Sequence, residues 1–295
     1  MEWHGSCVAG ISLWERLIPF SGRMRFCQTS KQLKDPGMAE QIWRIQIGHG
    51  PLVATALHDG HELRDELAEY MSLDEAGRLR EEDPFTGQWT KVAPTRVVGL
   101  RSRFEADLNR PRNKAVYRTP GDAWGLKVWK DLLPDDVANR SLAEYDAFYT
   151  ALGELYGELA EQHEKFVVFD LHTYNHRREG AGGPPAAPEE NPQVNIGTGT
   201  LNRDRWGAVI DSFIEALRSF DFPGGNLDVR ENVKFRGGEH PRWAHEKFPE
   251  SACVIAVEFK KFFMDEWTGS PDERYINAIG EAMQSTVPAV LESLK

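Results

Sequence analysis

Two apolar stretches, VVFDLHTYNH at residues 167–176 and CVIAVEF at residues 253–259, give the strongest indication of the architecture. Each is a run of apolar residues, rich in Val and aromatic side chains, that is typical of a strand buried on both faces. We therefore predict central strands at 166–171 and 253–261. Both runs are interrupted by charged or histidine side chains near their ends, so we expect chemistry where these strands stop.

Around these two segments, short β-rich runs alternate with long amphipathic helices. Further strands are predicted at 42–47, 52–57, 95–100, 103–108, 193–197 and 227–233, and helices at 135–164, 203–219 and 271–294. Helices of this length between strands indicate parallel crossovers. The pattern predicts an α/β fold, a three-layer sandwich with a mixed, mostly parallel central sheet. Ligands of such sheets bind at the carboxyl ends of the strands.

The composition narrows the class of protein. With 295 residues, of which 40% are hydrophobic, the chain can bury a large core without disulfides. Its 35 basic and 46 acidic residues give a formal charge of −11, which argues against a nucleic-acid or membrane partner. The sequence contains no apolar run long enough to span a bilayer and no signal-peptide pattern. Three cysteines without metal-ligand spacing favour a reducing compartment, so we expect a cytoplasmic protein.

The first 37 residues differ from the rest, because they carry five basic and three acidic residues in an otherwise acidic chain. We interpret residues 1–37 as a disordered leader or the product of an upstream start codon, with a single folded domain over 38–295. An N-terminal helix that caps the fold is the alternative.

Histidines at two strand ends indicate a metal site. His58 ends the apolar run PLVATAL and opens the bend HDGHEL, where the spacing lets two of His58, His61 and Glu62 face one ion. The strand at 166–171 breaks at His172, and Asp170 lies on the same side of that strand, where we expect it to orient the histidine. Three protein ligands and one open position are what a catalytic zinc ion needs. A polar helix start is the alternative interpretation of the HDGHEL bend.

The segment SRFEADLNRPR (102–112) concentrates arginines around Asn109. A guanidinium group binds a carboxylate in a bidentate manner and stabilises an oxyanion, so this segment is a candidate for substrate binding. Surface ion pairs with the acidic residues 81–83 are the alternative.

Glu258 lies within the apolar run at 253–259. Burial of a carboxylate raises its pKa toward the range that suits a general base and acid. An ion pair with Lys260 at a sheet edge is the alternative. The segment GAGGPPAAPEENP (180–192) is interpreted as a loop, either a lid beside the site or a surface excursion.

Taken together, the segments HDGHEL, SRFEADLNRPR, DLHTYNH and CVIAVEFKKFFMDEW resemble the N-formylglutamate amidohydrolase family, within the zinc carboxypeptidase and aspartoacylase class. The resemblance extends over about residues 40–290. It implies a phosphorylase/hydrolase-like α/β sandwich that holds one zinc ion. It also implies His58 and His172 as ligands. The second ligand stays open between His61, which we favour, and Glu62, because the wider class usually has Glu where this chain has His61.

The resemblance also implies roles for other residues. Arg103 resembles the arginine that polarises the oxyanion, Asn109 and Arg110 resemble the pair that clamps a substrate carboxylate, and Glu258 resembles the catalytic glutamate. Arg177, which follows the DLH motif, is a further candidate for substrate binding, with a solvated polar face as the alternative.

The function implied in this way is zinc-dependent hydrolysis of the amide bond of a small N-formyl or N-acyl amino acid. N-formyl-L-glutamate, which would give formate and glutamate, is the first choice. The alternatives are a zinc hydrolase of a different small amide or peptide, and a non-catalytic binding protein on the same scaffold. The sequence leaves the native metal and the oligomeric state open.

Overall fold

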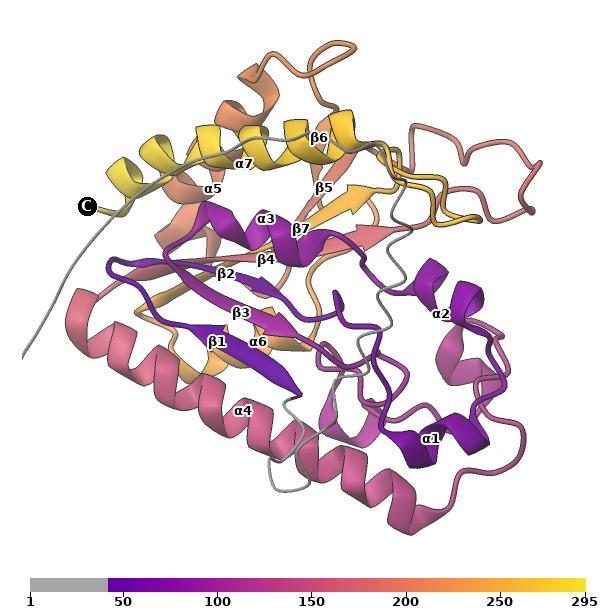
Figure 1. Ribbon diagram of the computed structural model, residues 1–295. Helices are drawn as coiled ribbons and strands as arrows, with labels where there is room; N and C mark the ends of the chain where they lie inside the picture. Colours follow the sequence, from indigo (N-terminus) through magenta and orange to yellow (C-terminus); the bar gives the residue numbers. More distant parts are fainter. Residues whose placement is uncertain (1–41) are drawn as a thin grey trace, which may run out of the picture. The chain divides into compact units, whose positions relative to one another are not determined.

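The computed structural model describes residues 42–295. Within this part of the chain, seven strands form one sheet in the order β1-β3-β2-β4-β7-β5-β6 (Figure 1). The strands are β1 (Trp43–Gln46), β2 (Leu52–Ala56), β3 (Thr95–Gly99), β4 (Phe166–Tyr174), β5 (Val194–Gly197), β6 (Val229–Glu231) and β7 (Ala252–Lys260). Neighbouring strands are parallel except for the pairs β1–β3 and β5–β7. The prediction of a mixed, mostly parallel sheet is confirmed.

Strands β4 and β7 form the centre of the sheet, as their apolar sequences predict. They pair in parallel from Phe166 opposite Ala252 to Tyr174 opposite Lys260. Every residue of β4 is buried. Val167, Phe169 and Leu171 pack into one core, and Phe166 and Val168 pack into the core on the opposite face. Both strands therefore need apolar side chains at successive positions.

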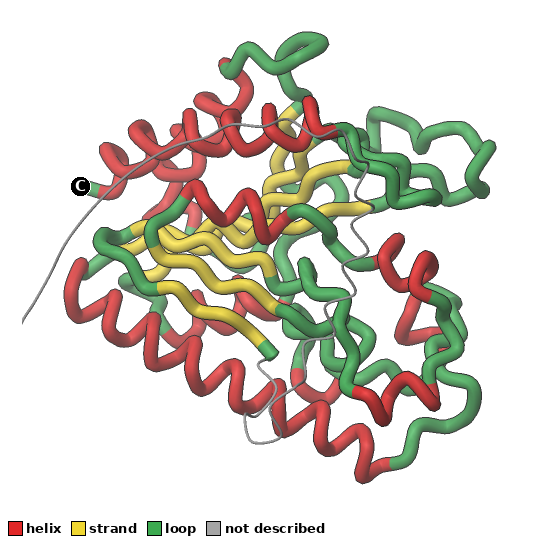
Figure 2. The backbone as a smooth tube through the Cα atoms, viewed as in Figure 1, coloured by secondary structure: helices red, strands yellow, loops and turns green. Residues whose placement is uncertain are grey.

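Helices cover both faces of this sheet, which confirms the three-layer sandwich (Figures 1 and 2). On one face lie α3 (Thr86–Trp89), α5 (Arg203–Ser219) and α7 (Glu273–Leu294), and on the other lie α4 (Asp135–His163) and α6 (Glu239–Lys247). Asn202 and Asp272 cap the first turns of α5 and α7 through their side-chain oxygens, as helix starts require. Helices α4, α5 and α7 agree closely with the predicted ranges, whereas α3 and α6 were not predicted.

Additional short elements gather near the carboxyl ends of the strands. These are α1 (Asp65–Tyr70), α2 (Glu75–Glu81) and the 3-10 turns η2 (Arg112–Lys114) and η3 (Pro120–Ala123). They surround a third apolar cluster that includes Phe104, Tyr117 and Trp129. This cluster joins α1, the segment between β3 and α4, and the first turn of α4. The remaining 3-10 turn, η1 (Thr90–Val92), directly precedes β3, and its Val92 packs into the core that α7 shares.

The predicted strand at 103–108 is wrong, because the chain forms turns there. The alternation of polar and apolar residues at 103–108 suggested a strand with one solvent-exposed and one buried face. Instead Glu105 and Asp107 are fully buried and pair with Arg64 and Arg103, respectively. Ion pairs inside the insertion therefore produce the same pattern as a half-exposed strand.

Among the described residues, no helix combines the length and the apolar character that a membrane crossing requires. The predicted leader at residues 1–37, and the predicted start of the domain at residue 38, lie outside the described residues.

Candidate active site

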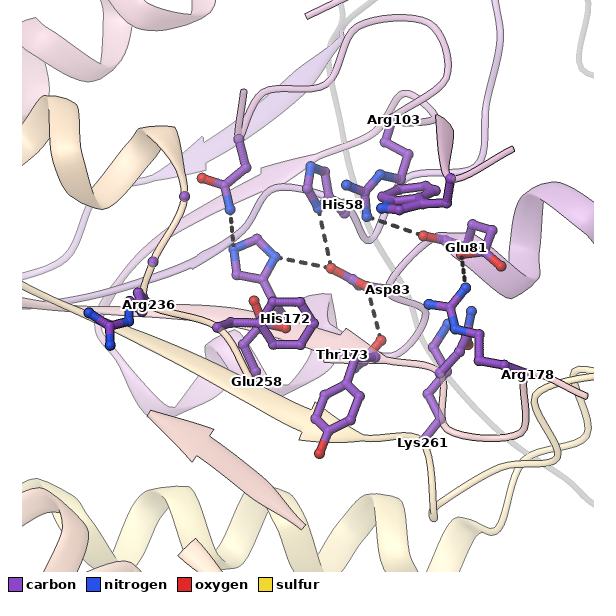
Figure 3. Close-up of a pocket in the computed structure, with 17 residues that line it drawn as sticks. His58, Glu81, Asp83, Arg103, His172, Thr173, Arg178, Arg236, Glu258 and Lys261 are labelled. Atoms are coloured by element: carbon purple, nitrogen blue, oxygen red, sulfur yellow. Dashed lines mark hydrogen bonds and ion pairs between the residues drawn. The ribbon is translucent and has the colours of Figure 1, made fainter. Parts of the chain in front are cut away.

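A cavity of about 210 Å³ opens at the carboxyl ends of β2, β4 and β7 (Figure 3). This is the position where ligands bind in α/β sheets. Its walls come from segments far apart in sequence, and they carry charged, amide and aromatic side chains. The lining residues are His58, Glu81, Asp83, Arg103, Asn109, Trp124, His172, Thr173, Tyr174, Asn175, Arg178, Phe235, Arg236, Gly237, Gly238, Glu258 and Lys261.

His58, Asp83 and His172 form a buried group in one wall of the cavity. Their potential ligand atoms lie within 4.8 Å of one another. The Nδ1 atoms of His58 and His172 lie 3.3 Å and 3.0 Å from the same carboxylate oxygen, Oδ2 of Asp83. The other oxygen, Oδ1, accepts a hydrogen bond of 3.0 Å from Thr173, which fixes the orientation of the carboxylate.

A second carboxylate holds the outer nitrogen of each histidine. Nε2 of His58 lies 2.7 Å from Asp107, and Nε2 of His172 lies 3.1 Å from Asp170. These contacts hold the two rings so that both Nδ1 atoms face Asp83, where each can carry a proton or, once deprotonated, coordinate a cation. Carboxylates hold metal-ligating histidines in this way in many proteins, so two imidazole nitrogens and one carboxylate here fit a divalent metal.

The electrostatics also favour a cation. Burial alone would raise the pKa of Asp83, but hydrogen bonds from His172 and His58 hold this pKa far below its usual range. Burial would lower the pKa of His172, but Asp170 and Asp83 raise it well above its usual value. Asp83 therefore stays ionised. Its negative charge favours a cation beside the Nδ1 atoms, either as bound protons or as a metal ion.

Glu258 faces the same cavity from β7. It is the register partner of His172 on β4, so both side chains project on the side of the sheet that α4 and α6 cover. Burial raises the pKa of Glu258 to about 8. A carboxyl group with this pKa can exchange a proton near neutral pH, as a general base or acid requires.

Arg103 and Asn109, both singled out in the sequence, line the cavity. The guanidinium of Arg103 donates to Asp107 at 2.8 Å, to the carbonyl of Glu81 at 3.2 Å and to Tyr117 at 3.3 Å. A guanidinium carries five N–H donors, so further donors are left for a ligand.

Asn109 links the histidine group to helix α6. Its Nδ2 lies 3.2 Å from Nε2 of His172, and its Oδ1 accepts from the backbone N–H of His240 at 3.0 Å. Gly238 makes room for this amide, because a Cβ atom at that position would lie 2.3 Å from Oδ1 of Asn109. Asn109 thereby connects the first turn of α6 to the ring of His172.

Arg110 and Arg177 are not among the residues that line the cavity. Arg110 donates to the carbonyl of Asp122 at 2.6 Å and lies over the ring of Tyr117. Arg177 forms an ion pair of 3.2 Å with Asp265. Both guanidinium groups are therefore occupied by contacts within the protein.

The structure does not bring His61 or Glu62 to the histidine group, in contrast to the expectation. Nδ1 of His61 lies 2.5 Å from Glu82, and Glu62 is exposed and bridged through its backbone to Arg101. The reason lies at Gly60, which packs so tightly against Leu100 that a Cβ atom would lie 2.2 Å from its carbonyl carbon. The bend therefore runs beside residues 100–102 and away from the end of β2.

Asp83, which takes the position expected for His61, and Lys261 were not identified as site residues from the sequence. Asp83 lies in the acidic run 81–83, which the sequence offers only as partners for surface arginines. Lys261 is 1% exposed, and its ammonium donates to the carbonyls of Arg80 at 2.6 Å and Glu82 at 2.7 Å. The available sequence signals are weak. Asp83 directly precedes a proline, and Lys261 directly follows the buried strand β7.

Known proteins share this fold and sequence pattern. The family model described as N-formylglutamate amidohydrolase matches residues 50–263. The crystal structure of N-formylglutamate amidohydrolase from Ralstonia eutropha JMP134 has a TM-score of 0.65 at 15% identity, covering 85% of this chain and 96% of that chain. A gene product of Agrobacterium tumefaciens has a TM-score of 0.60 at 16% identity, covering 86% and 96%.

No curated protein sequence matches this chain significantly. At such low identities the two structures show the shared fold, while the family model spans well over half of the chain. The chain therefore belongs to the N-formylglutamate amidohydrolase family and is a hydrolase of the amidohydrolase type.

Proposed function

We propose that this protein is a zinc-dependent hydrolase of the amide bond in N-formyl or N-acyl amino acids, with N-formyl-L-glutamate as the best candidate. One observation carries the proposal: the buried group of His58, Asp83 and His172 shares a cavity with Glu258 in a member of this family. The products would be formate and glutamate.

His58, Asp83 and His172 would hold the metal ion. Two imidazole nitrogens and a carboxylate oxygen suit zinc better than the oxygen-preferring magnesium or calcium. When bound, zinc supplies a Lewis acid that polarises a carbonyl group and acidifies water. Asp107 and Asp170 contact the outer ring nitrogens, which would leave the Nδ1 atoms to coordinate the ion.

Glu258 would accept the proton of the attacking water and pass it to the nitrogen of the leaving amine. Burial raises its pKa to about 8 in the metal-free protein, and a bound cation would lower this pKa toward neutrality, so that the group can both accept and return a proton. Arg103 would donate an N–H that its contacts to Asp107, Glu81 and Tyr117 leave unused, stabilising the negative oxygen that develops on the carbonyl.

Asn109 stays a candidate substrate ligand because it lines the cavity, although its amide already contacts His172 and His240. The predicted roles of Arg110 and Arg177 in carboxylate binding stay predictions, and neither side chain lines the cavity. The same holds for His61 and Glu62 as metal ligands, and for the cytoplasmic location.

The test is the release of glutamate from N-formyl-L-glutamate by zinc-loaded protein, compared with protein treated with a chelator and then reloaded. Turnover that is lost with the metal and restored by zinc is the expected result. Turnover that survives complete removal of the metal would contradict the metal role. Zinc-bound protein without turnover would direct the search to other N-acyl amino acids and small peptides, or to a non-catalytic binding protein.

A further inference from the structure

The segment directly after β4, residues 175–178, contributes two polar side chains to the cavity that no step above uses. Asn175 and Arg178 both line the cavity, whereas Arg177 between them turns to Asp265. Figure 3 shows the Arg178 guanidinium beside Glu81 and Lys261, on the side of the cavity that Asp83 occupies.

Arg178 is weakly engaged compared with the other cations in this part of the cavity. Arg103 donates to three groups of the protein, and Lys261 is held by two backbone carbonyls. Within residues 42–295, Arg178 has one partner, Oε2 of Glu81 at 3.5 Å, and its side chain is 50% exposed. Glu81 has a closer partner in Arg80 at 2.6 Å. The guanidinium of Arg178 can therefore take up another anion without leaving Glu81 unpaired.

Asn175 supplies an independent observation. The residue is 3% exposed, and its Oδ1 is buried without a hydrogen-bond partner among the described residues. A buried amide group without partners is costly unless a ligand or water satisfies it. Since no hydrogen bond within residues 42–295 holds the amide, rotation of its terminal group presents either Nδ2 or Oδ1 to the cavity.

We propose that Asn175 and Arg178 form the subsite that binds a carboxylate of the substrate. This assignment rests on the proposed function, and it selects N-acyl amino acids over neutral amides. The guanidinium binds the carboxylate through two N–H groups, and the amide of Asn175 either donates to the carboxylate or accepts the N–H of the acylated nitrogen. The substrate has two carboxylates when its side chain is acidic, and the chemistry of the subsite fits either one.

Arg236 is the competing candidate. It lines the cavity and is exposed; its backbone carbonyl accepts a hydrogen bond from Gly199, but its guanidinium has no hydrogen-bond or ion-pair partner among the described residues. Figure 3, however, places its guanidinium on the far side of His172 from Asp83, directed away from Glu258. Arg178, on the side of the metal-binding carboxylate, is therefore the better placed of the two.

The test compares wild type, Arg178→Gln and Arg236→Gln on N-formyl-L-glutamate and N-formyl-L-glutamine. We expect Arg178→Gln to lower kcat/KM for the glutamate substrate by about 10- to 100-fold, mainly through KM, because a charge-assisted contact is lost. An equal loss on the glutamine substrate assigns the subsite to the α-carboxylate. A loss confined to the glutamate substrate assigns it to the side-chain carboxylate.

A control variant and a second subsite variant test whether the effect is specific to the subsite. Arg140→Gln removes an exposed arginine that pairs with Glu66 on the surface, and it should leave kcat/KM for both substrates unchanged. Asn175→Asp places a negative charge in the subsite and should lower kcat/KM for N-formyl-L-glutamate at least as much as Arg178→Gln does. Because a buried carboxylate also destabilises the fold, the kinetics are measured well below the melting temperature of this variant. Wild-type kinetics for Arg178→Gln, or a loss that occurs with Arg236→Gln instead, would overturn the assignment.

Ligand binding separates this proposal from the proposed function. Calorimetric titration with N-acetyl-L-glutamate needs no turnover. Binding by wild type that weakens in Arg178→Gln would support the subsite even if N-formyl-L-glutamate is not hydrolysed. Hydrolysis together with equal binding by both proteins would support the function and reject the subsite, and a wild type that does not bind the ligand would also reject it.

Discussion

His172 and Glu258 lie opposite each other on the adjacent parallel strands β4 and β7. The backbone ladder of these two central strands thus sets the separation between the proposed metal ligand and the proposed proton acceptor. Functional groups on rigid strands are held more precisely than groups on loops. Asp83, in contrast, reaches the same point from the segment between α2 and α3, and it depends on contacts to Thr173 and to both histidines.

Replacing the proposed proton acceptor should separate chemistry from metal binding. We expect Glu258→Gln to lower kcat by about 100- to 10,000-fold, because a positioned general base contributes this much, while zinc content stays unchanged. Steady-state kinetics together with metal analysis of the purified variant checks this. A near-normal kcat would show that another group moves the proton.

Two substitutions decide between His61, the ligand expected from the sequence, and Asp83, the ligand proposed from the structure. Asp83→Asn should weaken zinc binding by at least about 100-fold, since even loss of a group that orients a ligand costs 10- to 100-fold. His61→Gln should retain zinc, because the His61 ring contacts Glu82 and Arg78 outside the cavity. Competition with a chromophoric chelator measures both affinities. Weaker zinc binding by His61→Gln than by Asp83→Asn would instead support His61 as the ligand.

Metal affinity should depend on pH. Asp170 and Asp83 raise the pKa of His172, so its ring binds a proton at neutral pH when no metal is bound. Coordination needs the Nδ1 lone pair, so we expect zinc binding to release about one proton or more at pH 7 and to weaken as the pH falls. Calorimetry in buffers of different ionisation enthalpy counts these protons. Binding without proton release would mean that His172 is neutral in the metal-free protein.

Glu258 should cost stability in the metal-free protein. Its pKa is about 8 in the folded state and near 4.5 ordinarily, so the folded protein keeps a proton that the unfolded chain loses between these values. Stability therefore falls as the pH rises from 4.5 to 8. Glu258→Gln should unfold with a free energy roughly 4 kcal/mol higher than wild type at pH 8, a difference that vanishes in acid. Urea unfolding at several pH values in the presence of a chelator tests this, and parallel curves for the two proteins would refute it.

Lys261 should hold the segment that carries Asp83. Lys261→Met leaves the carbonyls of Arg80 and Glu82 without their donor, and we expect a loss of about 2–4 kcal/mol in the free energy of unfolding, together with weaker zinc binding. Lys260→Met is the matched control, because the Lys260 ammonium donates to the carbonyl of Asn191 instead. If both variants lose the same stability and bind zinc normally, Lys261 has no special role in placing Asp83.

The sequence correctly predicted those strands and helices whose pattern of apolar residues fits only one type of secondary structure. The runs of β4 and β7 are apolar at successive positions, which fits a buried parallel strand, and the long helices have clear amphipathic patterns and capping residues. His58, His172 and Glu258 were found for the same reason, since each interrupts or ends such a run.

The rest depends on contacts between distant residues, which the local pattern does not contain. Asp83 meets His172 across 89 positions of sequence, and nothing near Asp83 indicates this partner. The direction of the bend after His58 depends on how closely Gly60 packs against Leu100, which is a property of the folded sheet. The buried ion pairs of Glu105 and Asp107 imitate a strand pattern for the same reason.

Gly238 supports the site by having no side chain, because the amide of Asn109 occupies the space that a Cβ atom would need. An alanine scan assumes that each substitution takes atoms away, but at this position it would add one. The methyl group would push Asn109 away from His172, and activity would fall although glycine has no functional group. A mutational map of this protein would then score position 238 among the residues that perform the chemistry, when its contribution is an unfilled volume.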